Sequence, residues 1–258
     1  MKQATLTRRN SLKLFALSGT TILTMPNVLW SAKKVAKPLR FGIITDSHYA
    51  DRDPAGTRFY RDALPKMNEA IKALNEADLD FLIHLGDFKD QGAEANPQET
   101  LKYLQEVETV FQRFDGDAYH ALGNHDVDSI RKAEFLRNIK NAGQEQARSY
   151  YSFETSAFIC IVLDANYDTA GKDHFYAEGA NWEDAHIPSE ELEWFKNTLT
   201  QAQKPVLVFC HHPLYPFYKE GSKFHVTNHQ EVQELMEASQ KVIACFHGHV
   251  HKEEFKTI

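Results

Sequence analysis

Five strand-like, mostly apolar runs in this chain each end in a short block of polar, metal-binding residue types. The runs cover residues 39–45, 79–85, 118–122, 206–210 and 242–246. The blocks that follow them are Asp46-Ser47-His48, Gly86-Asp87 with Asp90, Gly123-Asn124-His125-Asp126, His211-His212-Pro213 and Gly248-His249-Val250-His251. Open α/β sheets build their sites at the carboxyl ends of their strands. The pattern therefore predicts a fold in which five strand ends meet at one place.

The segments between these runs alternate between helix and strand patterns. Helical spacing of apolar residues is present in 58–77, 98–114, 129–138, 189–199 and 231–239. Residues 149–154 and 158–164 are joined by a short turn, which predicts an antiparallel pair. Residues 166–188 form a long polar loop, and a loop of this length is usually functional or mobile. We predict an α/β sandwich of two packed, mixed β-sheets flanked by helices.

The first residues of the chain are typical of an export signal. Thr7-Arg8-Arg9-Asn10-Ser11-Leu12-Lys13 precedes a modestly apolar stretch over residues 14–25. This resembles a twin-arginine signal, although an amphipathic helix or an uncleaved membrane anchor is an alternative. We therefore expect a signal segment over residues 1–32, a linker over 33–38 and a catalytic domain over 39–258, in a protein exported to the periplasm.

The charge of the chain argues against nucleic acid as a partner. The net charge is −7, and residues 1–32 contribute +4, so the remainder carries −11. A nucleic-acid surface needs clustered cations to displace counterions, and this domain is acidic. The expected partner is a small phosphorylated substrate, drawn by bound metal ions. Contact with a membrane is expected only through the export machinery or an uncleaved anchor.

The ligand types in the five blocks point to divalent metals. They offer carboxylate, amide and imidazole groups and contain no cysteine thiolate. Such mixed oxygen and nitrogen donors suit two hard-to-borderline ions, with Mn, Fe and Zn as candidates. We predict a dinuclear hydrolytic centre.

The order of these motifs resembles the calcineurin-like metallophosphoesterase superfamily, from about residue 39 to the end of the chain. The resemblance implies that each of two metals has its own ligands and that Asp87 bridges them. The implied ligands are Asp46, His48 and His251 for the first metal and Asn124, His211 and His249 for the second. It further implies that a hydroxide bridging the metals attacks phosphorus.

The remaining residues of the blocks receive supporting roles. The resemblance implies that His125 is a general acid or hydrogen-bond donor, with Asp126 holding its tautomer; the alternative is that His125 only braces its loop. Asp90 is expected to orient a ligand histidine, or else to end a turn. Family members have a His-x-Pro motif, so His211 is the expected ligand and His212 a pocket residue or a neighbour of the ligands.

A narrower resemblance concerns the substrate. Residues Gly56–Arg61, Tyr150-Tyr151 and the stretch from His211 to Pro216 are similar to the branch of manganese-dependent ADP-ribose/CDP-alcohol diphosphatases. This implies a phosphoanhydride substrate and favours manganese. Arg52 and Arg58 could contact a second phosphate and Tyr215 could stack on a base or sugar. The alternatives are exposed helix charges for the arginines and ordinary packing for the tyrosine.

Two other functions stay open at this point. One is a phosphomonoesterase of the acid-phosphatase type, although Phe88, Lys89 and Asp90 stand where purple members place a metal-binding tyrosine. The other is a non-catalytic scaffold, which the complete ligand set disfavours. The chain ends seven residues after His251, whereas family members continue with further strands, so we expect a smaller or incomplete second sheet.

Overall fold

The strands form two sheets in the computed structural model, which describes residues 38–216, 223–253 and 255. The first sheet has the order β1-β2-β3 and is parallel, with β1 at Phe41–Ile44, β2 at Phe81–His84 and β3 at Ala118–His120. The second has the order β4-β5-β6-β7. Its strands are Tyr151–Glu154, Ile159–Leu163, Val206–Cys210 and Val242–Phe246. Only β4 runs antiparallel to its neighbour, as the sequence predicted for this pair.

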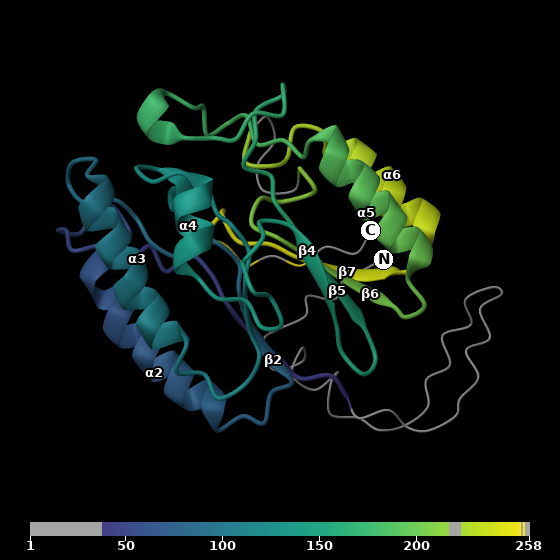
Figure 1. Cartoon of the computed structure of the whole chain (residues 1–258), viewed down its shortest axis with the longest axis horizontal. Helices are drawn as coiled ribbons and strands as arrows, with labels where there is room; N and C mark the ends of the chain where they lie inside the picture. The colour runs from purple at the N-terminus through teal and green to yellow at the C-terminus, as the bar shows by residue number, and fades with distance from the viewer. Residues whose placement is uncertain (1–37, 217–222, 254, 256–258) are drawn as a thin grey trace, which may run out of the picture. The chain divides into compact units, whose positions relative to one another are not determined.

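Helices follow the strands as the alternation predicted. Among the described residues, the α-helices are α2 at Ala63–Asn75, α3 at Pro97–Phe111, α4 at Lys132–Asn138, α5 at Ser189–Gln201 and α6 at His229–Ser239. The same part of the chain has the 3₁₀ turns η1 at Tyr60–Asp62, η2 at His125–Val127 and η3 at Tyr176–Glu178. Figure 1 shows α2, α3 and α4 on one side of the strands and α5 and α6 on the other.

Alternate residues of each central strand face different layers. In β2, Phe81 and Ile83 pack between the two sheets, whereas Leu82 packs against α2 and α3. In β6, Phe209 faces the other sheet and Val208 faces α5 and α6. Both faces of these strands are covered, which is why they read as continuous apolar runs. The expected α/β sandwich is confirmed.

The predicted helix over residues 58–77 begins later than expected. Residues 55 and 58 form an isolated bridge, η1 follows, and α2 starts only at Ala63. Pro65 then lies in the first turn of α2, where its missing N–H leaves no hydrogen bond unmade. This delay matters for function because Arg58 is held in a loop beside the carboxyl end of β1.

The proposed signal segment, residues 1–32, and residues 33–37 of the linker lie outside the described residues. Within the described part of the chain, no helix has the length and apolar character needed to span a bilayer.

A buried ion pair joins β3 to α3. His120 Nε2 lies 2.9 Å from Glu108 Oε2, and both side chains are buried. Burial alone would lower the pKa of His120, but the charge of Glu108 and contacts with Glu108 and Asn141 outweigh it and raise the pKa. Below the ordinary value of 6.5 the imidazole of His120 is therefore protonated in the folded state.

We expect Glu108→Gln to lower the free energy of unfolding by about 3 kcal/mol near pH 6, because it leaves a buried imidazolium without its partner. The pKa of His120 is raised in the folded state. The stabilisation that the ion pair with Glu108 provides is therefore complete below the ordinary pKa of 6.5, and it is lost as pH rises through the pKa of the folded protein. Urea denaturation at several pH values measures the free energy of unfolding of the wild type and of Glu108→Gln. Glu69→Gln on the surface of α2 is the control. A difference between wild type and Glu108→Gln that grows with pH would contradict the assignment.

Candidate metal centre

The backbone is strained at the expected ligand positions. Five of the expected ligands have φ in the left-handed region: Asp46 at 54°, His48 at 49°, Asp87 at 53°, His249 at 71° and His251 at 49°. Residues with a Cβ atom rarely adopt this conformation, and such strain concentrates at functional sites. The surrounding fold therefore holds these side chains in place at the expense of local strain.

Two glycines of the motifs permit close approach of the loops. A Cβ atom at Gly123 would lie 2.1 Å from the backbone nitrogen of Asp87, and one at Gly248 would lie 2.2 Å from Thr45 Oγ1. Any side chain at either position would push two ligand loops apart. The glycines of the Gly-Asn-His-Asp and Gly-His-Val-His blocks thus have a packing reason for their presence.

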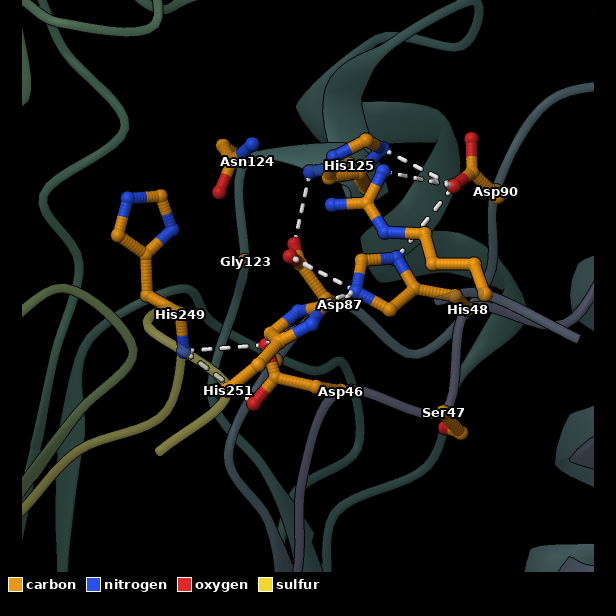
Figure 2. A network of polar contacts seen from close by, with 12 residues as sticks. Asp46, Ser47, His48, Asp87, Asp90, Gly123, Asn124, His125, His249 and His251 are labelled. Atoms are coloured by element: carbon orange, nitrogen blue, oxygen red, sulfur yellow. Dashed lines mark hydrogen bonds and ion pairs between the residues drawn. The ribbon is translucent and has the colours of Figure 1, made fainter. Parts of the chain in front are cut away.

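The first group of possible ligands surrounds Asp46. Asp46 Oδ1 lies 3.3 Å from His251 Nε2 and 3.9 Å from His48 Nε2, and His48 Nε2 lies 3.6 Å from Asp87 Oδ2. One potential ligand atom from each of the four residues fits within 4.8 Å of the others. These residues come from the segments that follow β1, β2 and β7, and Figure 2 shows their side chains close together. This group can hold one metal ion.

The second group shares Asp87 with the first. His211 Nε2 lies 3.2 Å from Asp87 Oδ2 and 3.2 Å from Asn124 Oδ1, and Asp87, His211 and His249 also form a compact potential ligand group. His211 Nδ1 lies 2.7 Å from the carbonyl oxygen of Leu85, a contact that leaves Nε2 directed at the centre. Asp87 is thus placed between two neighbouring ligand sets.

The electrostatics of the centre are those of a cation site. Burial alone would raise the pKa of Asp87, but nearby His211, His125 and His48 outweigh it and hold the pKa well below its usual range. Burial alone would lower the pKa of His211, but Asp87 and Asp46 raise it to about 9. The two carboxylates thus favour a proton on His211. A divalent ion would compete with that proton for the His211 nitrogen.

The surroundings of His249 test further whether these residues suit metal ions. Its Nε2 atom is buried and has no hydrogen-bond partner among the described residues, and burial lowers the pKa of its imidazole to about 3. A neutral, unpartnered imidazole nitrogen is the form that binds metal. With oxygen donors from Asp46, Asp87 and Asn124, the residues present fit two divalent metal ions.

Asp90 holds two histidines. Its Oδ2 atom lies 3.3 Å from His48 Nδ1 and 3.1 Å from His125 Nδ1. Figure 2 shows both imidazoles turned towards it. The carboxylate therefore favours a proton on each Nδ1 atom, which leaves His48 Nε2 towards the metal ligands and His125 Nε2 for substrate. This is the kind of placement expected for Asp90 from the sequence.

The role expected for Asp126 needs correction. Its carboxylate does not contact His125; it accepts hydrogen bonds from the backbone N–H groups of Phe88, Lys89 and Gly123 at 2.9, 3.3 and 2.8 Å. The 3₁₀ turn η2 points the side chain inward, and burial together with Asp87 raises its pKa to about 7. Asp126 therefore joins the loops after β2 and β3, and Asp90 takes the place beside His125.

Lys89 completes this connection and was not singled out as a site residue. Its fully buried Nζ atom donates to the His125 carbonyl oxygen at 2.6 Å and lies 2.5 Å from Asp128 Oδ1. The sequence could have indicated Lys89, because it is a charged residue between the expected site residues Asp87 and Asp90. Lys89 and Asp126 cross-link the same two loops from opposite directions.

His212 lies where the sequence placed it, beside the ligands. Its ring is 4.7 Å from that of His249, and the side chain is buried. Burial lowers its pKa well below the usual value, and neither ring nitrogen has a hydrogen-bond partner in the described part of the chain. His212 is thus a neutral neighbour of the second ligand group.

A cavity of about 680 Å³ opens from the centre. Its floor includes Asp87, Asn124, His125 and His249, and both Arg52 and Arg58 line it. Arg58 lies 3.9 Å from Asp90, and Arg52 lies 4.5 Å over the ring of Tyr60. The two arginines are thus placed beside the space where substrate would lie.

For Tyr215 the structure matches the second of the two expected roles, ordinary packing. The tyrosine does not line this cavity; it packs against the apolar cluster between the second sheet, α5 and α6. Its position two residues after Pro213 suggested a pocket residue, but the chain turns it towards the helices. The aromatic residues that line the cavity are instead Tyr60, Tyr176, Trp182 and Phe224. Trp182 and Phe224 were missed because they belong to loops whose path the sequence does not predict.

The comparisons with known proteins agree with this geometry. The model of the calcineurin-like phosphoesterase family matches residues 39–253. A curated relative from Oryza sativa subsp. japonica, named manganese-dependent ADP-ribose/CDP-alcohol diphosphatase, is 27% identical over 82% of this chain and 77% of its own length. A relative from Fibrobacter succinogenes, named a probable cyclic nucleotide phosphodiesterase, is 25% identical over 84% of this chain and 74% of its own length.

A solved structure shares the fold. The crystal structure of a dimetal phosphatase from Danio rerio matches with a TM-score of 0.64 at 18% identity, covering 83% of this chain and 82% of that one. The family match spans the five ligand blocks and most of the chain. On these grounds the chain belongs to the calcineurin-like phosphoesterase family.

Proposed function

We propose that this protein hydrolyses a phosphoanhydride bond in a small, nucleotide-like substrate with the help of two manganese ions. The observation that carries the proposal is the placement of Asp87 in both ligand groups, which puts two cation sites side by side. Membership of the family supports hydrolysis of a phosphoester-type bond in general. The narrower substrate and the choice of manganese are supported by the names of the relatives.

In this proposal, each of the two potential ligand groups holds one metal ion. Asp46, His48 and His251 would hold one ion, Asn124, His211 and His249 the other, and Asp87 would contact both. When bound, the two ions would lower the pKa of water at the site and neutralise charge on the phosphoryl oxygens. Asn124 contributes an oxygen without adding negative charge.

His125 is the proposed proton donor to the leaving oxygen. Asp90 contacts its Nδ1 atom at 3.1 Å, so the Nε2 atom can carry the proton into the cavity. Lys89 holds the backbone carbonyl of the same residue at 2.6 Å, which fixes the loop. The bond between phosphorus and the leaving oxygen breaks as the bond between phosphorus and the water oxygen forms. The leaving oxygen takes the proton of His125, and the attacking water releases one proton to solvent.

The cavity favours a substrate with organic groups beyond the phosphates. A volume of about 680 Å³ is in the range of pockets for drug-sized ligands and is far larger than one phosphate requires. Arg58 and Arg52 provide positive charge for a second phosphate. These features suit a diphosphate better than a simple monoester.

The test compares three substrates with added Mn²⁺: ADP-ribose, bis-p-nitrophenyl phosphate and p-nitrophenyl phosphate. We expect the largest kcat/KM for ADP-ribose and the smallest for the monoester. A second measurement after removal of metal with a chelator should show loss of turnover that Mn²⁺ restores. Turnover of the monoester alone would instead make the protein a phosphomonoesterase.

We further propose that residues 1–32 direct export by the twin-arginine route, on the strength of the Thr7–Lys13 motif. Cell fractionation of the wild type and of a variant with Arg8→Lys and Arg9→Lys tests this. Export that is unaffected by the double substitution would contradict it.

A further inference from the structure

The long loop over residues 166–188 is fastened to the domain at several points. Asn166 Nδ2 donates to the Leu122 carbonyl oxygen at 2.9 Å, and the Ala177 N–H donates to the Asp128 carbonyl oxygen at 2.8 Å. Lys132 Nζ lies 2.6 Å from Asp173. Arg131 forms an ion pair with the loop as well. The length of this loop suggested a functional or mobile segment, and these contacts describe a wall that is fastened to the domain before substrate binds.

A second loop is joined to the same wall. The Thr227 N–H donates to the Ala185 carbonyl oxygen at 2.7 Å, and Lys223 Nζ lies 2.8 Å from Glu183 Oε2. Next to the ion pair, the rings of Trp182 and Phe224 meet, with centroids 5.2 Å apart and planes inclined by 34°. Two loops from distant parts of the chain thus place one aromatic pair at the cavity.

The aromatic pair lies at one end of the cavity. The Phe224 ring is 5.7 Å from that of His249, whereas Arg58 is next to Asp90. Figure 2 shows His249 and Asp90 on either side of Asp87. The Trp182 side chain is 40% exposed although it lines the cavity, which is a large apolar surface to leave open to water. An aromatic surface therefore lies on the His249 side and a cationic one on the Asp90 side.

We propose that Trp182 and Phe224 form a stacking surface for a flat heteroaromatic ring, such as a nucleobase, in the half of the substrate on the His249 side. This inference rests on the proposed function and narrows its substrate class. The phosphates lie over Asp87 and towards Arg58, and the ring lies against the two side chains. Stacking on aromatic side chains tolerates different bases because every base has a π-face.

The first experiment compares a diphosphate that has a heteroaromatic ring with one that has none. For ADP-ribose, Trp182→Ala should raise KM about 10-fold and leave kcat within about twofold, the size expected for loss of one stacked base. For dimethyl diphosphate, which has no ring, KM should not change. Trp182→Phe should restore most of the affinity, and Trp194→Phe, a matched change in α5 away from the cavity, should behave as wild type. An equal rise in KM for both substrates would mean that Trp182 only supports the loop.

The second experiment does not depend on turnover. The chain has three tryptophans, Trp30, Trp182 and Trp194, so a variant with Trp30→Phe and Trp194→Phe reports on Trp182 alone. We expect AMP to quench its fluorescence in a saturable way and ribose 5-phosphate to leave it unchanged. If the protein hydrolyses none of the substrates but AMP still quenches the fluorescence, the proposed function is wrong and the proposed stacking surface is supported. Equal responses to AMP and ribose 5-phosphate would overturn the stacking surface.

Discussion

Asp87→Asn is expected to reduce hydrolysis of ADP-ribose by at least about 10³-fold and to lower the metal content from two ions per chain to one or fewer. Asp87 is the only described residue shared by the two groups of possible metal ligands that contain Asp46 or His211. An amide has one carbonyl oxygen and no negative charge, so it replaces a bridging carboxylate poorly. Metal analysis after dialysis, alongside steady-state kinetics, measures both effects.

The matched control is Asp115→Asn, an exposed aspartate in the loop before β3. It should retain two metals and full activity. An Asp87→Asn protein that keeps two tightly bound metals and more than about a tenth of the activity would show that the carboxylate is not the bridge.

His125→Ala is expected to lower kcat by about 10²- to 10⁴-fold while both metals remain bound, because it removes a proton donor and no ligand. The loss should depend on the leaving group. For bis-p-nitrophenyl phosphate the loss should be small, since p-nitrophenolate departs without a proton, and for a substrate with an alcohol leaving group it should be large. The slope of log kcat against the leaving-group pKa is the measurement that separates these cases.

A histidine outside the cavity provides the control for this series. His229 begins α6 and contacts Gln233, and His229→Ala should leave the slope unchanged. If His125→Ala reduces kcat equally for every leaving group, the residue braces its loop rather than donating a proton. That outcome would return Lys89 and Asp90 to purely structural roles.

The fold and the meeting of the ligands could be predicted because both depend on local pattern. Each ligand block follows a strand, and parallel strands bring their carboxyl ends to the same edge. The pairing of β4 with β5 followed from a short turn between them. The boundaries of α2 were less predictable, since the apolar spacing continues into the bridge and 3₁₀ turn that precede Ala63.

The directions of individual side chains were the part that could not be predicted. Asp126 is adjacent to His125 in sequence, but the turn η2 sends it to the backbone of the Gly86-Asp87 loop. Tyr215 follows a ligand block and still packs, partly buried, against the apolar cluster beside α5 and α6. Two residues that are adjacent in a loop can therefore point their side chains at different parts of the protein. A 3₁₀ turn or a bend at proline has no repeating pattern from which the direction of a side chain can be predicted.

The cavity walls were unpredictable for a different reason. Trp182 and Phe224 are 42 positions apart and meet only because two irregular loops are fastened together. Their meeting depends on specific ion pairs and backbone hydrogen bonds, which leave no repeating signal in a sequence. The long polar loop could be predicted from the sequence as functional or mobile, whereas the contacts that fasten it to the domain required the structure.

The most direct test of the two-ion centre is titration of the metal-free protein with Mn²⁺, followed by electron paramagnetic resonance. The placement of Asp87 between the two ligand groups predicts that two ions bind per chain and that the spectrum at saturation is that of an exchange-coupled pair. Saturation at one ion per chain, or two ions that give only the spectrum of isolated Mn²⁺, would contradict the account.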